Sequence, residues 1–278
     1  MPRSLVSCGA ILVAAGSLFS INSVAPAGEL LAVRFEDGAL YRASTVDGSL
    51  TPTIPTGVPF VGALEMSPAD GFVYGFTAEQ NLFRFHPTTF ELEIVGQFDQ
   101  FLYEGGLAFA PDGTAYAATG GSLEAPELYR LDVNTLEMTL VGTITGGAHD
   151  INGLAWRGDG KLVGMDRGSN ALITIDPTNA ASSTLAPLTP LVGAVGGMAV
   201  LDGVGYLATS GTGTSTPGSN ELWRFDLFTG AHTRVGSFAP TIAFPFTGIS
   251  GLAAIPEPSC GALTVAPLAA LLRRRRGL

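Results

Sequence analysis

The chain has 278 residues, of which 46% are hydrophobic and only 14% are charged, and 37 are glycine. So much apolar sequence excludes a disordered protein, and so little charge excludes an ordinary helical one. Fourteen basic residues against 24 acidic residues give a formal net charge of −10, which excludes the basic surface that a nucleic-acid partner requires.

Residues 1–27 have the pattern of a secretory signal peptide. Arg3 supplies positive charge, an uncharged apolar run extends from Leu5 to Ile21, and Ala25 and Ala27 place small residues just before Gly28. The apolar run is too short for a comfortable membrane span. We therefore expect an exported protein whose mature chain begins at Gly28.

The middle of the chain, residues 28–255, contains an internal repeat. Its first element is a short apolar segment, usually Leu-aromatic-Arg, whose five copies start 42, 46, 44 and 50 residues apart. The copies start at Leu40, Leu82, Leu128, Leu172 and Leu222. Most copies are followed by a Val-Gly pair, then by a Gly-Leu-Ala type segment and by another apolar segment after a glycine turn. Four strand-like segments in each repeat of about 45 residues indicate a propeller blade.

The two ends of residues 28–255 each contain part of a blade. The last Gly-Leu-Ala type copy, Gly251–Ile255, has no strand after it, and the strand-like segment Leu30–Glu36 has no such copy before it. Pairing the two segments in one blade would close the ring and remove free sheet edges. The sequence therefore predicts an all-β, five-bladed propeller closed by both ends of the chain. A pair of β-sandwiches is the alternative, but it would not explain the period.

The blades resemble propellers of the NHL and YVTN type. The resemblance depends on the Gly-Leu-Ala segments and on Pro-Asp-Gly turns such as Pro111-Asp112-Gly113. The Trp-Asp signature of WD40 repeats is missing from the sequence.

One face of such a propeller collects the loops before each innermost strand and after each second strand, and function is often found on loops of this kind. We expect this face to carry Glu36, Asp37 and the polar loop from Thr209 to Asn220. The candidate catalytic residues on it are Glu104, His149, Asp150 and Asp166, and the candidate ligand-binding residues are Tyr103, Asn152 and Arg167.

The chemistry of these candidates leaves three functions open. A histidine beside carboxylates can transfer protons or bind a metal. Some five-bladed propellers are glycosidases, and Glu65, Glu104, Asp150 and Asp166 are the carboxylates to try in that role. However, only Glu65 lies within an innermost segment, and turn formation explains an Asp-Asn loop more simply. The sequence favours a non-catalytic binding module; a hydrolase of extracellular polysaccharide and a structural matrix protein are the alternatives.

The sequence predicts no cofactor and no metal site. Asp132–Asn134 and Asp176–Asn179 hint at Ca²⁺ loops, but they lack the glycine and final glutamate of an EF-hand and recur at a hairpin position. Both cysteines, Cys8 and Cys260, lie in the terminal segments. The body of the protein therefore has no thiol for a disulfide, for catalysis or for a metal.

The tail, residues 256–278, has three parts in order. They are Pro256-Glu257-Pro258, an apolar segment from Ser259 to Leu272, and the four arginines Arg273, Arg274, Arg275 and Arg276. The apolar segment is short for a membrane span, and the arginines favour the cytoplasmic side. This arrangement resembles the PEP-CTERM sorting signal of bacterial exosortase substrates, although Pro267 interrupts the apolar segment.

The resemblance implies where the protein goes and what it meets. It implies an exosortase-like processing enzyme as one partner and a transient membrane contact through the tail. The final location would be the cell surface or the extracellular matrix, with retention in the membrane before the tail is processed. We expect an extracellular glycan or a surface protein as the other partner.

Overall fold

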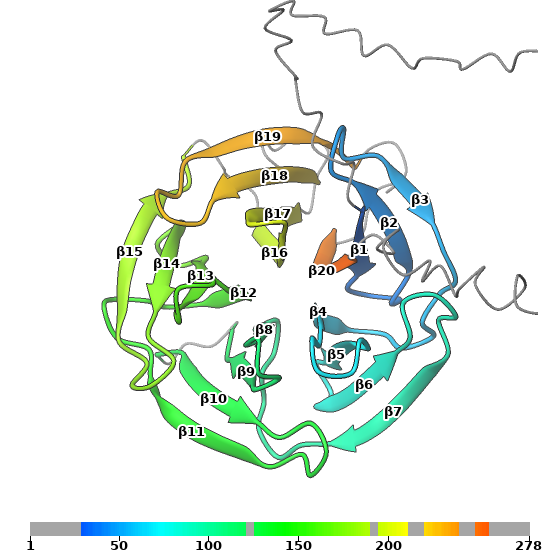
Figure 1. Ribbon diagram of the computed structural model, residues 1–278, viewed down its shortest axis with the longest axis horizontal. Helices are drawn as coiled ribbons and strands as arrows, with labels where there is room; N and C mark the ends of the chain where they lie inside the picture. Colours follow the sequence, from blue (N-terminus) through cyan, green and yellow to red (C-terminus); the bar gives the residue numbers. More distant parts are fainter. Residues whose placement is uncertain (1–28, 121–124, 190–193, 211–219, 239–247, 256–278) are drawn as a thin grey trace, which may run out of the picture.

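The computed structural model describes residues 29–120, 125–189, 194–210, 220–238 and 248–255. These residues form twenty β-strands in five four-stranded antiparallel sheets, arranged around an axis as the blades of a propeller (Figure 1). No helix in this part of the chain has the length and apolarity needed to cross a bilayer. The expected five-bladed fold is thus confirmed, whereas the predicted signal segment and tail lie outside the described residues.

Each blade is numbered in chain order, and its strands are given from the axis outward. Blade 1 consists of β20 (Ile249–Ile255), β1 (Glu29–Arg34), β2 (Leu40–Ser44) and β3 (Leu50–Pro52). Blade 2 consists of β4 (Val61–Met66), β5 (Val73–Thr77), β6 (Asn81–Phe85) and β7 (Leu92–Gln97). Blade 3 consists of β8 (Gly106–Phe109), β9 (Ala115–Ala118), β10 (Glu127–Leu131) and β11 (Met138–Thr143). Blade 4 consists of β12 (Ile151–Trp156), β13 (Leu162–Asp166), β14 (Ala171–Ile175) and β15 (Ser182–Pro187). Blade 5 consists of β16 (Ala194–Leu201), β17 (Val204–Ser210), β18 (Glu221–Asp226) and β19 (His232–Ser237).

Blade 1 joins the two ends of the propeller. Its innermost strand, β20, pairs antiparallel with β1, in a register that runs from Glu29 opposite Ile255 to Val33 opposite Gly251. This pairing confirms the expected closure, in which the C-terminal strand completes a blade begun by three N-terminal strands. The closed ring leaves no innermost strand without a partner in the sheet.

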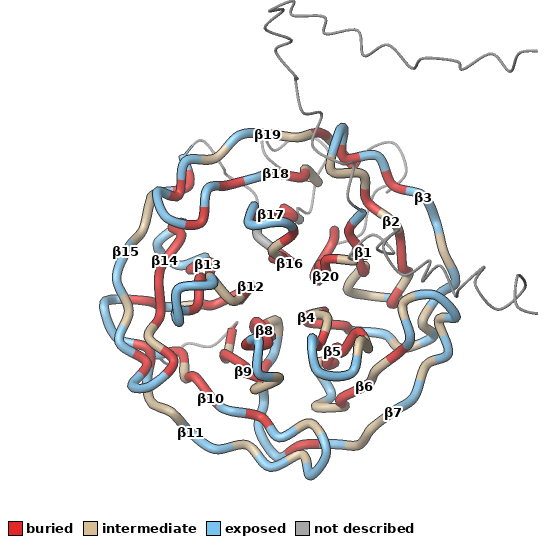
Figure 2. Tube along the Cα trace, viewed as in Figure 1, coloured by how far each residue is buried: buried red, intermediate tan, exposed pale blue. Residues whose placement is uncertain are grey.

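The hydrophobic core lies between the blades. Five clusters of buried side chains each fill the space between two neighbouring blades. The second and third strands of blade 4 are buried at every position, whereas the outermost strands β7, β11 and β15 are partly exposed. Figure 2 shows this gradient, with buried residues gathered toward the axis and exposed residues along the rim.

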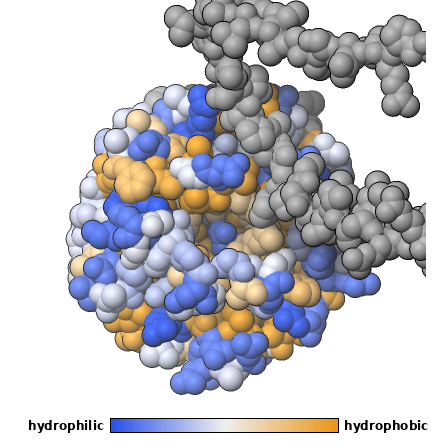
Figure 3. Space-filling model, viewed as in Figure 1, coloured by the Kyte–Doolittle hydropathy of each residue, from blue (hydrophilic) through white to orange (hydrophobic). Residues whose placement is uncertain are grey.

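Small residues allow the innermost strands to meet at the axis. A Cβ atom at Gly197 would lie 2.3 Å from the backbone nitrogen of Leu252, and one at Gly251 would lie 2.7 Å from that of Leu64. Because this packing is so close, the axis retains a cavity of only about 10 Å³. Viewed along the axis, the surface mixes hydrophilic and hydrophobic residues around a shallow central hollow (Figure 3). The innermost strands thus leave little free space along the axis.

The repeated Val-Gly pairs form β-bulges in the outermost strands. In blade 2, Leu82 pairs with Gly96 and Phe83 with Ile94, so Val95 is the extra residue. Blades 3, 4 and 5 have the same irregularity. A Cβ atom at Gly96 would lie 2.4 Å from Cδ1 of Leu136 in the next blade. The bulge thus twists an edge strand, which discourages pairing with other chains, and its glycine makes room for the neighbouring blade.

Candidate functional site

The loops expected to share one face do so, because all innermost strands run in the same direction along the axis. We call this end the mouth face and define it by residues 35–39, 53–60, 78–80, 98–105, 144–150 and 167–170. Most of the expected polar loop after β17, residues 211–219, lies outside the described residues. The opposite end, which carries the remaining hairpin turns, is called the turn face and is defined by residues 45–49, 67–72, 86–91, 110–114, 132–137, 157–161, 176–181, 202–203 and 227–231.

Four of the seven candidate residues converge at the mouth face between blades 3 and 4. Nη1 of Arg167, just after β13, lies 4.0 Å from Oε2 of Glu104 and 3.7 Å from Oδ2 of Asp150. The side-chain nitrogen of Asn152, in β12, donates a hydrogen bond of 3.4 Å to the same Glu104 oxygen. We call Glu104, Asp150, Asn152 and Arg167 the mouth cluster. It combines two carboxylates and an amide with one guanidinium.

Asn152 has an unused acceptor in this cluster. Its side chain is only 2% exposed, yet its Oδ1 has no hydrogen-bond partner among the described residues. Reversing the amide would not help, because it would place Oδ1 against the Glu104 carboxylate and leave the amide N–H groups without that acceptor. A buried acceptor without a donor costs about 1–3 kcal/mol. Asn152 also lines the axial cavity of about 10 Å³, which has room for about one water molecule that could donate to this oxygen.

The carboxyl group of Glu104 has a perturbed pKa. Burial raises its pKa above the usual value, the nearby Arg167 guanidinium opposes this, and the Asp150 carboxylate adds to it. Glu36, on the neighbouring loop of blade 1, contributes in the same direction. The mouth face thus concentrates negative charge that one arginine only partly balances.

Asp166 has its oxygens occupied by the loops around it. It is 1% exposed; its Oδ1 accepts the backbone N–H groups of His149, Asp150 and Gly168, and its Oδ2 accepts the N–H and hydroxyl of Ser169. These bonds attach the loop before β12 to the loop after β13. Asp166 therefore positions the backbone of Asp150, and the exposed side chain of His149 lies beside this network.

Exposed aromatic rings lie on the same face. Tyr103 is 48% exposed, and its ring centre is 5.9 Å from that of Phe101, which is 57% exposed. Phe60 is also exposed, and both Phe60 and Tyr103 have positive φ angles, 57° and 53°. That region is unusual for bulky side chains, and such strain is often found at functional sites. Phe60 and Phe101 were not among the expected site residues, although both lie just before innermost strands.

Glu65 does not join the other candidate carboxylates. It lies near the end of β4, toward the turn face, at a position that alanine fills in the other blades. The equivalent residues are Ala108, Ala155, Ala199 and Ala253. Its Oε2 has no hydrogen-bond partner among the described residues, and burial raises its pKa well above the usual value. Glu65 is thus a half-buried acid placed apart from the mouth cluster.

The two segments that hinted at Ca²⁺ loops are hairpin turns in the structure. Asp132 accepts the backbone N–H groups of Asn134 and Thr135, and Asp176 accepts that of Thr178. These hydrogen bonds lower the pKa of both carboxyl groups. Within the described ranges, no three His, Cys, Asp or Glu side chains are grouped so that they could hold a metal ion.

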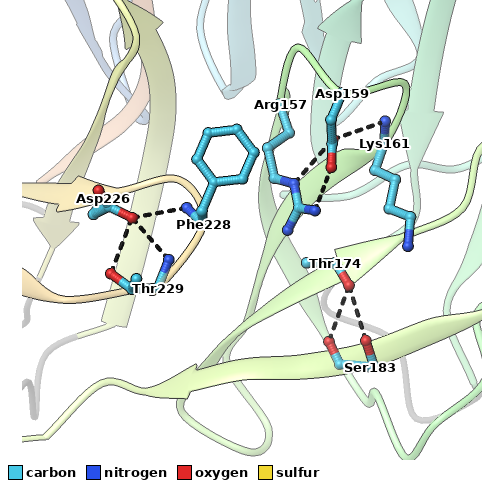
Figure 4. Close-up of polar contacts among 8 residues, drawn as sticks. All are labelled: Arg157, Asp159, Lys161, Thr174, Ser183, Asp226, Phe228 and Thr229. Carbon is cyan, nitrogen blue, oxygen red and sulfur yellow. Dashed lines mark hydrogen bonds and ion pairs between the residues drawn. The ribbon is translucent and has the colours of Figure 1, made fainter.

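The turn face elsewhere shows the same local use of polar groups. Figure 4 shows Asp226, whose carboxylate accepts the backbone N–H groups of Phe228 and Thr229 and the hydroxyl of Thr229. In the adjacent blade, Arg157 forms an ion pair with Asp159, and its guanidinium lies 5.1 Å from the ring centre of Phe228. The carboxylates here are thus satisfied within their own hairpins, and the contact between the blades is the Arg157 guanidinium on the Phe228 ring.

Comparisons with known proteins show the fold. No protein-family model and no curated protein matches the chain. It is similar to a chain in the crystal structure of a nidogen/laminin complex, with a TM-score of 0.52 and 14% identity over 82% of this chain and 86% of that chain. It is also similar to TolB from Acinetobacter baumannii, with a TM-score of 0.47 and 19% identity over 76% of this chain and 53% of that chain. At these identities, the shared feature is the β-propeller.

Proposed function

We propose that this protein is an exported, non-catalytic binding module that holds a glycan or protein ligand at its mouth face. The observation that carries the proposal is the convergence of Glu104, Asp150 and Arg167 at the mouth face, where Asn152 donates to Glu104. Exposed rings at Tyr103 and Phe101 add an apolar surface on the same face. Because the axial cavity holds only about 10 Å³, the ligand binds on the mouth and not inside the channel.

The terminal segments support a location outside the cytoplasm. The signal-like residues 1–27 would direct export, and the PEP-CTERM-like residues 256–278 would engage an exosortase-like enzyme at the membrane. The cell surface or the extracellular matrix is then where the propeller meets its ligand. The described similarity to a chain of a nidogen/laminin complex is consistent with a protein ligand for a propeller of this shape.

Co-sedimentation with extracellular matrix isolated from the producing cells tests this function. We expect the full chain to be retained, and we expect Asn152→Ala and Glu104→Gln to reduce retention while Glu91→Gln, an exposed acid on the turn face, leaves it unchanged. Treating the matrix with protease beforehand distinguishes a protein ligand, which is lost, from a glycan, which persists. Equal retention of all four proteins would contradict binding at the mouth.

A polysaccharide hydrolase is the second candidate, because one observation favours it. Glu104 has a raised pKa, as a general acid requires, and the Asp150 carboxylate lies close to it. Both are within 4.0 Å of one Arg167 nitrogen, so they are no further apart than the carboxyl pairs of glycosidases, about 5–10 Å. Release of reducing ends from matrix polysaccharide, abolished in Glu104→Gln, would establish this activity in place of simple binding.

A further inference from the structure

Blade 3 has a surface cavity of about 440 Å³, far larger than the cavity of about 10 Å³ at the axis. The cavity lies at the turn-face end of this blade (Figure 1), between the turn that joins β8 to β9 and the hairpin that joins β10 to β11. Pockets that bind small molecules have volumes of about 300–1,000 Å³. The charged residues that line this cavity are Asp112, Arg130, Asp132 and Glu137.

Arg130 occupies a position that the other four blades use for a bond within the blade. In each of them, the equivalent residue of the third strand forms a side-chain hydrogen bond of 2.6–3.0 Å with a neighbouring strand. These bonds join Arg42 to Glu29, Arg84 to Glu93, Thr174 to Ser183, and Arg224 to Thr233. Arg130 forms no hydrogen bond or ion pair with a described residue, and only the charge of Asp112 acts on it. Its N–H groups are therefore available beside the cavity.

Blade 2 fills the equivalent space with two of its own side chains. Phe72 occupies the position of Thr114, and its ring centre lies 4.9 Å from the guanidinium carbon of Arg84. Glu93 occupies the position of Thr139 and pairs with the same guanidinium. Blade 3 has a threonine at both positions, so its arginine has neither the ring nor the carboxylate. The two threonines thus leave room beside an arginine that has no bonded partner.

The cavity offers both donors and acceptors of hydrogen bonds. Arg130 supplies N–H donors, and the hydroxyl of Thr139, opposite it in β11, can donate or accept. The carboxylate of Glu137 forms no hydrogen bond with a described residue and supplies acceptors. Asp112 and Asp132 accept backbone N–H groups of their own turns, so these two residues shape the wall of the cavity.

This mixture of groups favours a neutral ligand that is rich in hydroxyls. An anion would meet three carboxylates, and a cation would meet the Arg130 guanidinium. A divalent metal would need several oxygen ligands, and the described residues bring no group of three His, Cys, Asp or Glu together. An apolar ligand would desolvate the charged groups without replacing their hydrogen bonds. The vicinal hydroxyls of a sugar can accept from a guanidinium and donate to a carboxylate at the same time.

We propose that the blade 3 cavity is a binding site for a neutral saccharide, held by Arg130, Glu137 and Thr139. This site is separate from the mouth cluster, which lies at the opposite end of the propeller. The inference goes beyond the proposed function, and neither depends on the other.

Saturation-transfer NMR of the full chain tests the inference with a set of neutral sugars: glucose, galactose, mannose, maltose and cellobiose. We expect transfer to at least one of them, and less to glucuronic acid and glucosamine. Thr114→Phe and Thr139→Glu each give blade 3 a residue that blade 2 already accommodates, so both variants should fold, as thermal unfolding will confirm. Each should weaken the signal about fivefold, because one fills the cavity and the other binds Arg130.

A matched pair of variants separates the cavity from the general negative charge of the protein. Glu137→Gln should weaken the signal, whereas Glu91→Gln, at the equivalent position of blade 2, should leave it unchanged. No transfer from any neutral sugar overturns the inference, and so does a signal that Thr114→Phe and Thr139→Glu leave intact, because the sugar then binds elsewhere. A stronger signal from glucuronic acid or glucosamine also overturns it. Matrix retention tests the proposed function separately, because it depends on the mouth cluster.

Discussion

The two ends of the propeller use the same kinds of polar residue differently. On the turn face, carboxylates such as Asp132, Asp176 and Asp226 accept backbone N–H groups within their own hairpins. On the mouth face, Glu104 and Asp150 lie at a distance from Arg167 that is too long for a hydrogen bond. The turn-face carboxylates named here are held by donors of their own hairpins, whereas Glu104 at the mouth accepts one long hydrogen bond from Asn152 and lies 4.0 Å from Arg167.

This difference separates residues that fold the chain from residues available for function. An aspartate at the start of a hairpin stabilises the turn whatever the protein binds. An almost fully buried asparagine with an unpartnered oxygen lowers stability unless a water in the axial cavity donates to it. The comparison therefore predicts that substitutions of hairpin aspartates change stability but not binding to the matrix, whereas substitutions in the mouth cluster change that binding.

The largest expected loss of stability comes from a substitution at the axis, where the innermost strands of the blades pack together. In Gly197→Val, the new side chain begins 2.3 Å from the backbone nitrogen of Leu252, so blades 5 and 1 must separate at the axis. Overpacking of this kind costs about 3 kcal/mol or more. Chemical denaturation should show the loss. Ala63→Gly, in the equivalent position of blade 2, is the control and should cost no more than about 1 kcal/mol. Equal stabilities would contradict close packing at the axis.

The next effect compares one carboxylate from each face. Asp166→Ala leaves four buried or half-buried N–H groups and a hydroxyl without their acceptor, and should cost about 2–4 kcal/mol. Asp226→Ala removes an exposed turn carboxylate and should cost about 1 kcal/mol. Only Asp166→Ala should also weaken retention on the matrix, because it releases the backbone of Asp150. A loss of binding in both variants would remove the distinction between the faces.

Glu65 provides a further test of the comparison between the faces. It is an acid close to the turn face whose Oε2 has no hydrogen-bond partner among the described residues. Its pKa in the folded protein is raised by burial, so the native state keeps a proton that the unfolded chain has lost above pH of about 4.3. The stability that protonation provides is complete below that pH and is lost as the pH rises through the raised pKa. Glu65→Gln should therefore match the wild type at pH 4 and exceed it by about 1–3 kcal/mol at pH 8. Urea unfolding at both pH values measures the free energy of unfolding of the two proteins. The same difference between them at pH 4 and pH 8 would contradict a raised pKa of Glu65.

Much of this architecture follows from the sequence, because a repeat constrains position strongly. The blade count, the closure of β1 with β20 and the shared loop face all follow from the period and from the one missing strand at each end. The register shifts in the innermost strands of blades 1, 2, 4 and 5 could not be predicted from the period, because a bulge adds a residue to a strand without changing the order of the strands.

The sequence predicts the candidate site only in part, and the physical reason differs from that for the fold. Glu104, Asp150, Asn152 and Arg167 were identifiable from their loops, but the sequence could not distinguish their roles from that of Asp166. Both kinds of carboxylate precede or follow a strand, and only the folded backbone decides which one receives N–H donors. The exposed rings of Phe60 and Phe101 were missed because isolated apolar residues in loops are common and become informative only when their neighbours are known.

The smallest expected change in stability gives the most direct test of the comparison. Asn152→Ala removes an acceptor without a partner and one weak 3.4 Å hydrogen bond to Glu104, so the free energy of unfolding should change by less than about 1 kcal/mol. Retention on the matrix should nevertheless fall several-fold, because Glu104 loses the amide that orients its carboxylate. At the turn face, Asp132→Ala should do the reverse and lower stability by about 1 kcal/mol with no effect on retention. If Asn152→Ala destabilises the fold more than Asp132→Ala and leaves retention intact, then Asn152 contributes to packing at the axis and not to the binding surface.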